Sequence, residues 1–116
     1  MVTDKDREYI LNEHLRNISH ISDKERQRRV WINGEGPDFD EAVCYFFDIG
    51  DPILENYEDY GITEKQHQTL KRLRDEFETF SDDHYWPTQF IDTPEWEEII
   101  SLAKEVLKEF GYKSAR

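Results

Sequence analysis

The chain has 116 residues, a single cysteine and a formal net charge of −12 at pH 7. This length suits one domain that buries a core without help from metal or disulfides. The acidity counts against direct binding of DNA, RNA or anionic membranes, although a protein that mimics nucleic acid would carry the same sign. The lone Cys44 fits a reducing cytoplasm, and its apolar neighbours predict a buried side chain.

Two helices are predicted before residue 33. Thr3 has the position of an N-cap for the first helix, whose apolar face comprises Ile10, Leu11, Leu15 and Ile18. Ser22, with Glu25 three residues later, has the spacing of a cap for the second. The glycine- and proline-containing segment 33–37 follows as a flexible joint.

Two more helices are predicted between residues 38 and 61. Asp38 has the position of an N-cap, and the helix that it begins is expected to end near Gly50. Asp51 and Pro52 then have the order of N-cap and first helical residue. They predict a separate short helix that ends at Gly61.

The strongest helix signals lie in the last half of the chain. Thr63 and Gln66 form a capping box for a helix that ends at Asp82 and Asp83. Thr93 caps the final helix, which runs from about residue 94 to residue 110. The two apolar faces are expected to pack together: Leu70, Leu73, Phe77 and Phe80 against Trp96, Ile99, Ile100, Ala103, Val106, Leu107 and Phe110.

These patterns predict an all-α protein, a small bundle of about five to six helices. Residues 1–116 are expected to form a single domain, in which a helical hairpin (1–33) packs on a bundle (38–112). No stretch alternates apolar and polar residues for long enough to indicate strands. The charged N-terminal residues do not resemble a signal peptide, and no apolar run is long enough to span a membrane. A cytoplasmic location is therefore expected.

The residue patterns of enzymes and of metal or cofactor sites are missing. The five glycines are scattered, so no phosphate-binding loop is predicted. The histidines lack the spacing of zinc ligands, and the carboxylates lack that of a calcium loop: His14, His20, His67 and His84. We therefore expect no catalytic residues, no metal and no cofactor. The basic cluster is expected to face solvent or pair with neighbouring acids: Lys24, Arg26, Arg28 and Arg29.

Two long stretches contain many acidic residues and no lysine or arginine. Residues 30–64 contain ten acids, and residues 75–103 contain nine. Large aromatic residues lie among these acids. Such a surface is suited to a cationic protein, because charge accelerates encounter while tyrosine and tryptophan supply contact area. The residues expected to bind the partner are Asp82, Asp83, Tyr85, Trp86, Glu55, Glu58, Asp59, Tyr57 and Tyr60.

One short motif stands out within the second stretch. Asp82-x-x-Tyr85-Trp86-Pro87 follows a helix end and precedes Asp92-Thr93-Pro94 and the terminal helix, which runs into Gly111-Tyr112-Lys113. In this order of features, residues 63–113 resemble the second half of the colicin/pyocin nuclease immunity proteins, small acidic four-helix proteins that block a secreted nuclease. The resemblance implies that Asp82, Tyr85 and Trp86 hold the toxin and that the preceding helix sets specificity.

The chain departs from that family in three respects. Trp86 stands where the family has a second tyrosine, and residues 1–33 have no counterpart in the family. The helix after Thr63 carries Lys65, Lys71, Arg72 and Arg74, where the family is usually acidic. The expected function is a non-enzymatic immunity protein that neutralises a basic bacterial toxin, a nuclease. The alternatives are an acidic regulatory or adaptor domain, a nucleic-acid mimic and, last, an enzyme.

Overall fold

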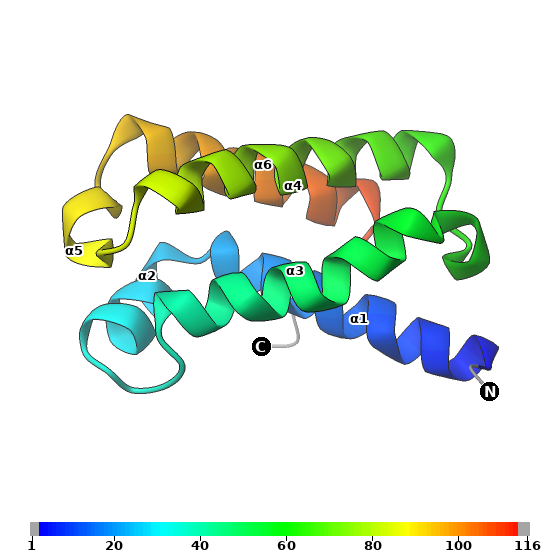
Figure 1. The fold of residues 1–116 in the computed structure, drawn as a ribbon, viewed down its shortest axis with the longest axis horizontal. Helices are drawn as coiled ribbons and strands as arrows, with labels where there is room; N and C mark the ends of the chain where they lie inside the picture. The colour runs from blue at the N-terminus through cyan, green and yellow to red at the C-terminus, as the bar shows by residue number, and fades with distance from the viewer. Residues whose placement is uncertain (1–2, 114–116) are drawn as a thin grey trace.

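Four long helices form an antiparallel bundle in which the chain runs up and down in turn (Figure 1). The computed structural model describes residues 3–113. The long helices are α1 (Asp4–Ile21), α3 (Phe39–Glu55), α4 (Glu64–Asp83) and α6 (Pro94–Glu109). Each packs against two neighbours, in the ring α1–α3–α4–α6. The short α2 (Lys24–Gln27) and α5 (Pro87–Phe90) bring the α-helices to six, and residues 3–113 contain no strand. The all-α prediction is confirmed.

The predicted N-caps of the four long helices are confirmed. Thr3 and Thr63 each form a complete capping box, with Asp6 and Gln66 respectively. The side chains of Asp38 and Thr93 accept hydrogen bonds from backbone N–H groups three residues later. After α6, Gly111 has a φ of 62°, a left-handed conformation that favours glycine. Local side-chain chemistry therefore fixes where these helices begin.

The second helix begins one residue later than predicted. Asp23 rather than Ser22 caps α2, because its carboxylate accepts the backbone N–H of Arg26 at 3.1 Å. The Ser22 hydroxyl instead donates to the Ser19 carbonyl at the end of α1. After α2 the chain continues as a π-helix, Arg28–Ile32, in which the Asn33 N–H donates to the Arg28 carbonyl at 3.0 Å.

The predicted helix break at Gly50 is wrong, since α3 continues through Gly50 and Pro52 to Glu55. Phe46 and Ile53 are both buried, seven residues apart on the same face of α3. Their burial holds one continuous helix in place, although proline inside a helix costs about 3 kcal/mol. Asp51 does not act as a cap, because its carboxylate pairs with Arg74. The 3-10 helix Tyr57–Tyr60 follows, and Gly61 ends it with a φ of 69°.

Gly50 has a packing role within α3. A Cβ at this position would lie 2.6 Å from Cε1 of His14, so the absent side chain lets the buried His14 ring rest on the α3 backbone. The same ring packs against Phe46, with centroids 5.1 Å apart. Burial lowers the pKa of His14 to about 4, and the charge of Asp51 offsets part of this effect. The imidazole is therefore neutral at pH 7.

The core lies where α4 and α6 pack together, as predicted from their apolar faces. Leu70, Leu73 and Phe77 are fully buried opposite Trp96, Ala103 and Val106. Trp96 is the largest buried side chain, and its Nε1–H donates to Oε1 of the buried Gln27 at 2.9 Å. This bond links α6 to α2. Leu107 and Phe110 are only half-buried at the edge of the core, and Cys44, predicted to be buried, is exposed on α3.

Candidate functional site

The turn between α4 and α5 presents two adjacent aromatic side chains to solvent. Tyr85 is 65% exposed and Trp86 is 66% exposed. Large aromatic side chains are usually buried, so two neighbours at this level of exposure are unusual. Neither ring supports the core in residues 3–113, where α5 is anchored instead by Phe90 and Ile91. Both rings are therefore free to contact a partner.

The backbone of this turn is held by its own side chains. The Tyr85 hydroxyl donates to the Asp82 carbonyl at 3.0 Å, which closes the turn over the end of α4. His84 Nδ1 donates to the Phe80 carbonyl at 2.8 Å, and the His84 ring stacks on Phe80 with centroids 3.9 Å apart. Phe80 is itself buried. The turn is therefore fixed to the core, which limits the entropy lost when a partner covers it.

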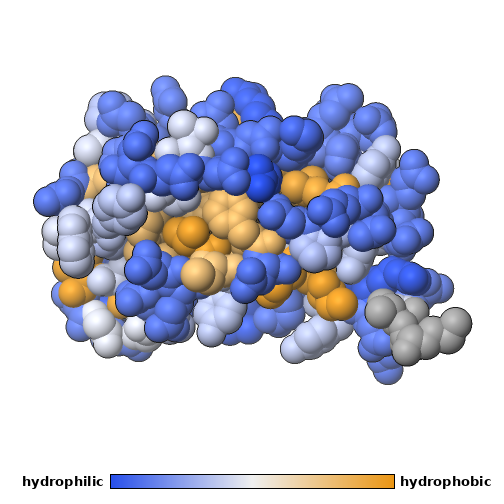
Figure 2. Space-filling view, viewed as in Figure 1, coloured by the Kyte–Doolittle hydropathy of each residue, from blue (hydrophilic) through white to orange (hydrophobic). Residues whose placement is uncertain are grey.

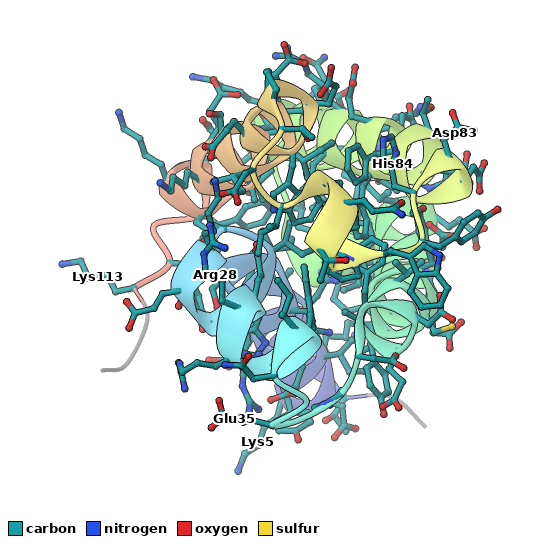
Figure 3. The ribbon with its side chains drawn as sticks, turned by 90° about the vertical axis from the view of Figure 1, so that its left-hand side faces the viewer. Lys5, Arg28, Glu35, Asp83, His84 and Lys113 are labelled. Atoms are coloured by element: carbon teal, nitrogen blue, oxygen red, sulfur yellow. The ribbon has the colours of Figure 1, made fainter. Side chains whose placement is uncertain are left out.

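Asp82 and Asp83 lie immediately beside the two rings. Both residues are exposed, and within residues 3–113 neither carboxylate forms an ion pair. Figure 3 shows Asp83 at the outer edge of the molecule, whereas the adjacent His84 turns inward. The turn thus combines unneutralised negative charge with aromatic contact area. A lysine or arginine of a partner protein would pair with these carboxylates, and the two rings would exclude water from that ion pair.

The structure does not bring all nine predicted partner-binding residues together. Asp82, Asp83, Tyr85 and Trp86 lie at the end of α4, whereas the other five lie around the 3-10 helix before its start. The 20 residues of α4 separate the two groups by about 30 Å. Figure 1 shows α5 and the 3-10 helix at opposite ends of the bundle.

The aromatic residues of the second group are already engaged within the chain. Tyr57 donates its hydroxyl to Oε2 of Glu64 at 2.8 Å, and its ring stacks on His67 with centroids 3.9 Å apart. The hydrogen bond to Glu64 raises the pKa of the Tyr57 hydroxyl. Tyr60 is half-buried and packs against the core. The acids Glu55, Glu58 and Asp59 remain exposed there.

The acidic stretches that lack bases in sequence do not all form unneutralised surfaces. Arg74 of α4 pairs with Asp51, Asp75 and Glu78, and its guanidinium lies 5.3 Å from the centre of the Phe47 ring. The hydrogen bonds that Arg74 donates to Asp51 raise the pKa of the Arg74 guanidinium above its usual value. At the other end of the bundle, ion pairs join Lys24 to Asp92 and Glu97 and join Arg28 to Asp92. The carboxylates of the turn escape this neutralisation.

Apolar surface runs along the seam between α3 and α4, bordered by polar side chains (Figure 2). Phe47 of α3 belongs to this seam, because its half-buried ring stacks near Phe77 and lies under Arg74. Apolar surface rimmed by polar groups is typical of contact sites.

Two exposed aromatic residues were not predicted as site residues. Tyr9 of α1 is 67% exposed and Tyr45 of α3 is 51% exposed. The helical period would have found Tyr45, because counting from the Asp38 cap places it about 100° around the helix from the buried Phe46, outside the core face. Tyr9 lies near the start of α1 and provides an exposed tyrosine on a different helix from the turn.

Among residues 3–113, no group of three or more His, Cys, Asp or Glu side chains is arranged to hold a metal ion. No helix in the described part of the chain combines the length and apolar composition needed to cross a membrane. Comparison with known proteins finds no family model, no curated protein and no solved structure that matches this chain. The resemblance to nuclease immunity proteins therefore stays a prediction.

Proposed function

We propose that this chain is a non-enzymatic immunity protein that binds and neutralises a basic bacterial toxin, a nuclease, in the cytoplasm. The observation that carries the proposal is the turn at the end of α4, where Tyr85 and Trp86 are about two-thirds exposed on a fixed backbone. Asp82 and Asp83 add charge beside them that forms no ion pair within residues 3–113. A partner with a cationic, nucleic-acid-binding cleft matches both features.

The net charge supports fast capture of such a partner. A charge of −12 attracts a cationic protein over a distance, which raises association rates about 10- to 1,000-fold over a neutral pair. The aromatic rings then supply affinity, because buried tryptophan and tyrosine contribute about 2 kcal/mol or more each as hot spots. An inhibitor that must bind before the toxin reaches nucleic acid needs both properties.

The proposal is tested by co-expression of this chain with the product of the neighbouring gene, followed by affinity measurement on purified variants if the two proteins bind. Trp86→Ala and Tyr85→Ala should each weaken binding by about tenfold or more, because the hot-spot contact is lost. Their melting temperatures should stay close to that of the parent chain, since both side chains are exposed.

Tyr9→Ala is the matched control, because it removes an equally exposed tyrosine from another helix. Its affinity for the partner should not change. Equal binding by all three variants would show that the turn is not the interface. Early melting of Trp86→Ala, with normal binding by Tyr85→Ala, would assign the turn a structural role and remove the main support for the proposal.

A further inference from the structure

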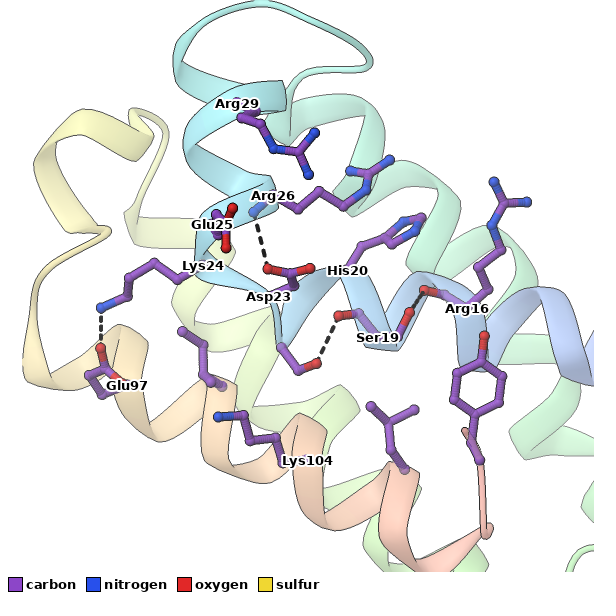
Figure 4. A pocket seen from close by; sticks show the side chains of 14 residues that line it. Arg16, Ser19, His20, Asp23, Lys24, Glu25, Arg26, Arg29, Glu97 and Lys104 are labelled. Carbon is purple, nitrogen blue, oxygen red and sulfur yellow. Dashed lines mark hydrogen bonds and ion pairs between the residues drawn. The ribbon is translucent and has the colours of Figure 1, made fainter. Parts of the chain in front are cut away.

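A basic hollow lies in this acidic protein, between the end of α1, α2 and α6. It has a volume of about 810 Å³, and five cationic side chains line it against three carboxylates. Figure 4 shows the side chains of Arg16, Arg26 and Arg29 gathered around one side of the hollow, near His20. Lys24, on another side, is paired with Glu97. The sequence predicted that the basic cluster would face solvent or pair with acids, and the structure divides it between the two roles.

The arginines of this hollow carry more positive charge than their surroundings balance. Within residues 3–113, the guanidinium groups of Arg26 and Arg29 form no ion pair, and the exposed Arg16 has only a 3.6 Å contact with the half-buried Glu13 at the edge of the neighbouring hollow. Burial, followed by the charges of Arg29 and Arg16, lowers the pKa of Arg26, although Asp23 opposes the shift. Burial and the charges of Arg26 and Arg16 also lower the pKa of His20 to about 4. An anion would relieve this repulsion.

A second, apolar hollow adjoins the first. It has a volume of about 400 Å³, which falls within the range of small-molecule sites. Ile21, Trp31, Tyr45 and Ile49 supply its apolar walls. Arg16, His20 and Arg26 line both hollows, so a molecule in the apolar hollow would meet guanidinium groups at the boundary.

The backbone that carries these residues is unusual and firmly held. Arg29 and Trp31 both belong to the π-helix Arg28–Ile32, a rare conformation that is frequent at functional sites. Gln27 fixes the start of this segment, because its Nε2 donates to the carbonyls of His20 and Ile21 while its Oε1 accepts from Trp96. The π-helix thus contributes a residue to each hollow: Arg29 lines the basic one and Trp31 lines the apolar one.

We propose that the two hollows form one site for a small organic anion with an aromatic body. The acidic group lies against Arg16, Arg26 and Arg29, and the body lies between Trp31 and Tyr45. Arginine forks suit phosphate and carboxylate groups. A small ligand fits better than a polyanion, which the net charge of −12 repels. No residue of the turn Asp82–Trp86 lines either hollow, so this site does not depend on the proposed immunity function.

Phenyl phosphate is the test ligand, with inorganic phosphate and phenol as its two halves. In a ¹H–¹⁵N NMR titration, phenyl phosphate should shift both the Trp31 indole N–H and the side-chain N–H signals of Arg26 and Arg29. It should bind at least about tenfold more tightly than either half, because it fills both hollows. Equal affinity for phenyl phosphate and inorganic phosphate would overturn the two-part site, and the absence of shifts would overturn the site altogether.

Arg26→Gln and Arg29→Gln should each weaken phenyl phosphate binding by about tenfold, because one charge-assisted contact is lost. Arg29 is exposed, so its variant remains informative if Arg26→Gln melts early. Arg72→Gln is the matched control: it removes the same charge from α4, where Arg72 is exposed and lines neither hollow. Weakening by Arg72→Gln to the same extent would show that only net charge is sensed and would overturn the proposal.

Discussion

At the scale of single residues, the apolar or polar character of a segment does not determine whether a side chain is buried. Cys44 and Tyr45 lie in an apolar run, yet both are exposed, because in a helix the neighbours Val43 and Phe46 face the core instead. His14 shows the reverse: a polar ring is 1% exposed, and its Nδ1 has no hydrogen-bond partner within residues 3–113. Composition alone does not predict either outcome, since the position on the helix decides it.

His14 should make the unfolding free energy depend on pH. The folded protein keeps the ring neutral until about pH 4, whereas the unfolded chain takes up a proton below about pH 6.5. The unfolded state therefore binds more protons in this window, and stability falls as pH drops from about 6.5 to about 4. The loss from His14 is up to about 3 kcal/mol, at about 1.4 kcal/mol per pKa unit.

Urea unfolding at a series of pH values measures this loss, and the His14 ring signal in NMR reports its protonation directly. His14→Gln should give a flatter profile in the same window. His20, whose pKa is also lowered to about 4, adds to the slope with the same sign. Protonation of His14 near pH 6.5 in the folded protein would contradict the prediction.

At the scale of elements, local signals predicted helix starts better than helix interiors. The caps at Thr3, Asp38, Thr63 and Thr93 depend on a side chain three residues from its partner, so the sequence contains all the information needed. The break predicted at Gly50 and Pro52 failed because contacts from other helices override the local preference. His14 of α1 occupies the space above Gly50. The carboxylate of Asp51 forms an ion pair with Arg74 of α4 and does not cap a helix.

Gly50→Ala should destabilise the fold, against the usual effect of this change in a helix. Alanine gains about 1 kcal/mol in helix propensity, but its Cβ would lie 2.6 Å from the buried His14 ring. Overpacking of this kind costs about 1–3 kcal/mol, so the clash should prevail. Thermal and urea unfolding of the variant measure the balance.

The double variant with His14→Ala identifies the cause. In that background Gly50→Ala should be neutral or stabilising, because the space above α3 is then free. An equal loss in both backgrounds would show that the α1–α3 contact is not the reason. If Gly50→Ala by itself stabilised the protein, α1 and α3 would be able to move apart and make room for the Cβ without loss of stability.

At the scale of the whole molecule, the charge pattern along the chain predicted a negative surface but not its distribution. The bundle brings Arg74 to Asp51 and brings Lys24 and Arg28 to Asp92, so residues far apart in sequence neutralise each other. The basic hollow is a product of the same folding, because Arg16, Arg29 and the residues of α6 meet only in three dimensions. The exposed turn, in contrast, is local in sequence and was predicted from its motif.

Added salt should stabilise the folded protein. Exposed ion pairs contribute only about 0–1 kcal/mol each, whereas a net charge of −12 produces repulsion throughout the compact state. Salt shortens the screening length from about 30 Å at 0.01 M to about 8 Å at 0.15 M, which weakens this repulsion. The melting temperature should therefore rise over that range. A fall would indicate that the networks around Arg74 and Asp92 dominate.

The π-helix between α2 and residue 33 has a consequence for the length of the chain. Its hydrogen bond spans five residues where an α-helix spans four, so the segment contains one residue more than a regular turn requires. If the same residues were wound as a regular α-helix, the chain after this segment would be rotated by one residue's step, about 100°, and Trp31 would turn away from its present direction. Its edge-to-face contacts with Phe39 and Trp96 would be lost. The one extra residue of the π-helix thus sets the direction of an aromatic wall of the apolar hollow.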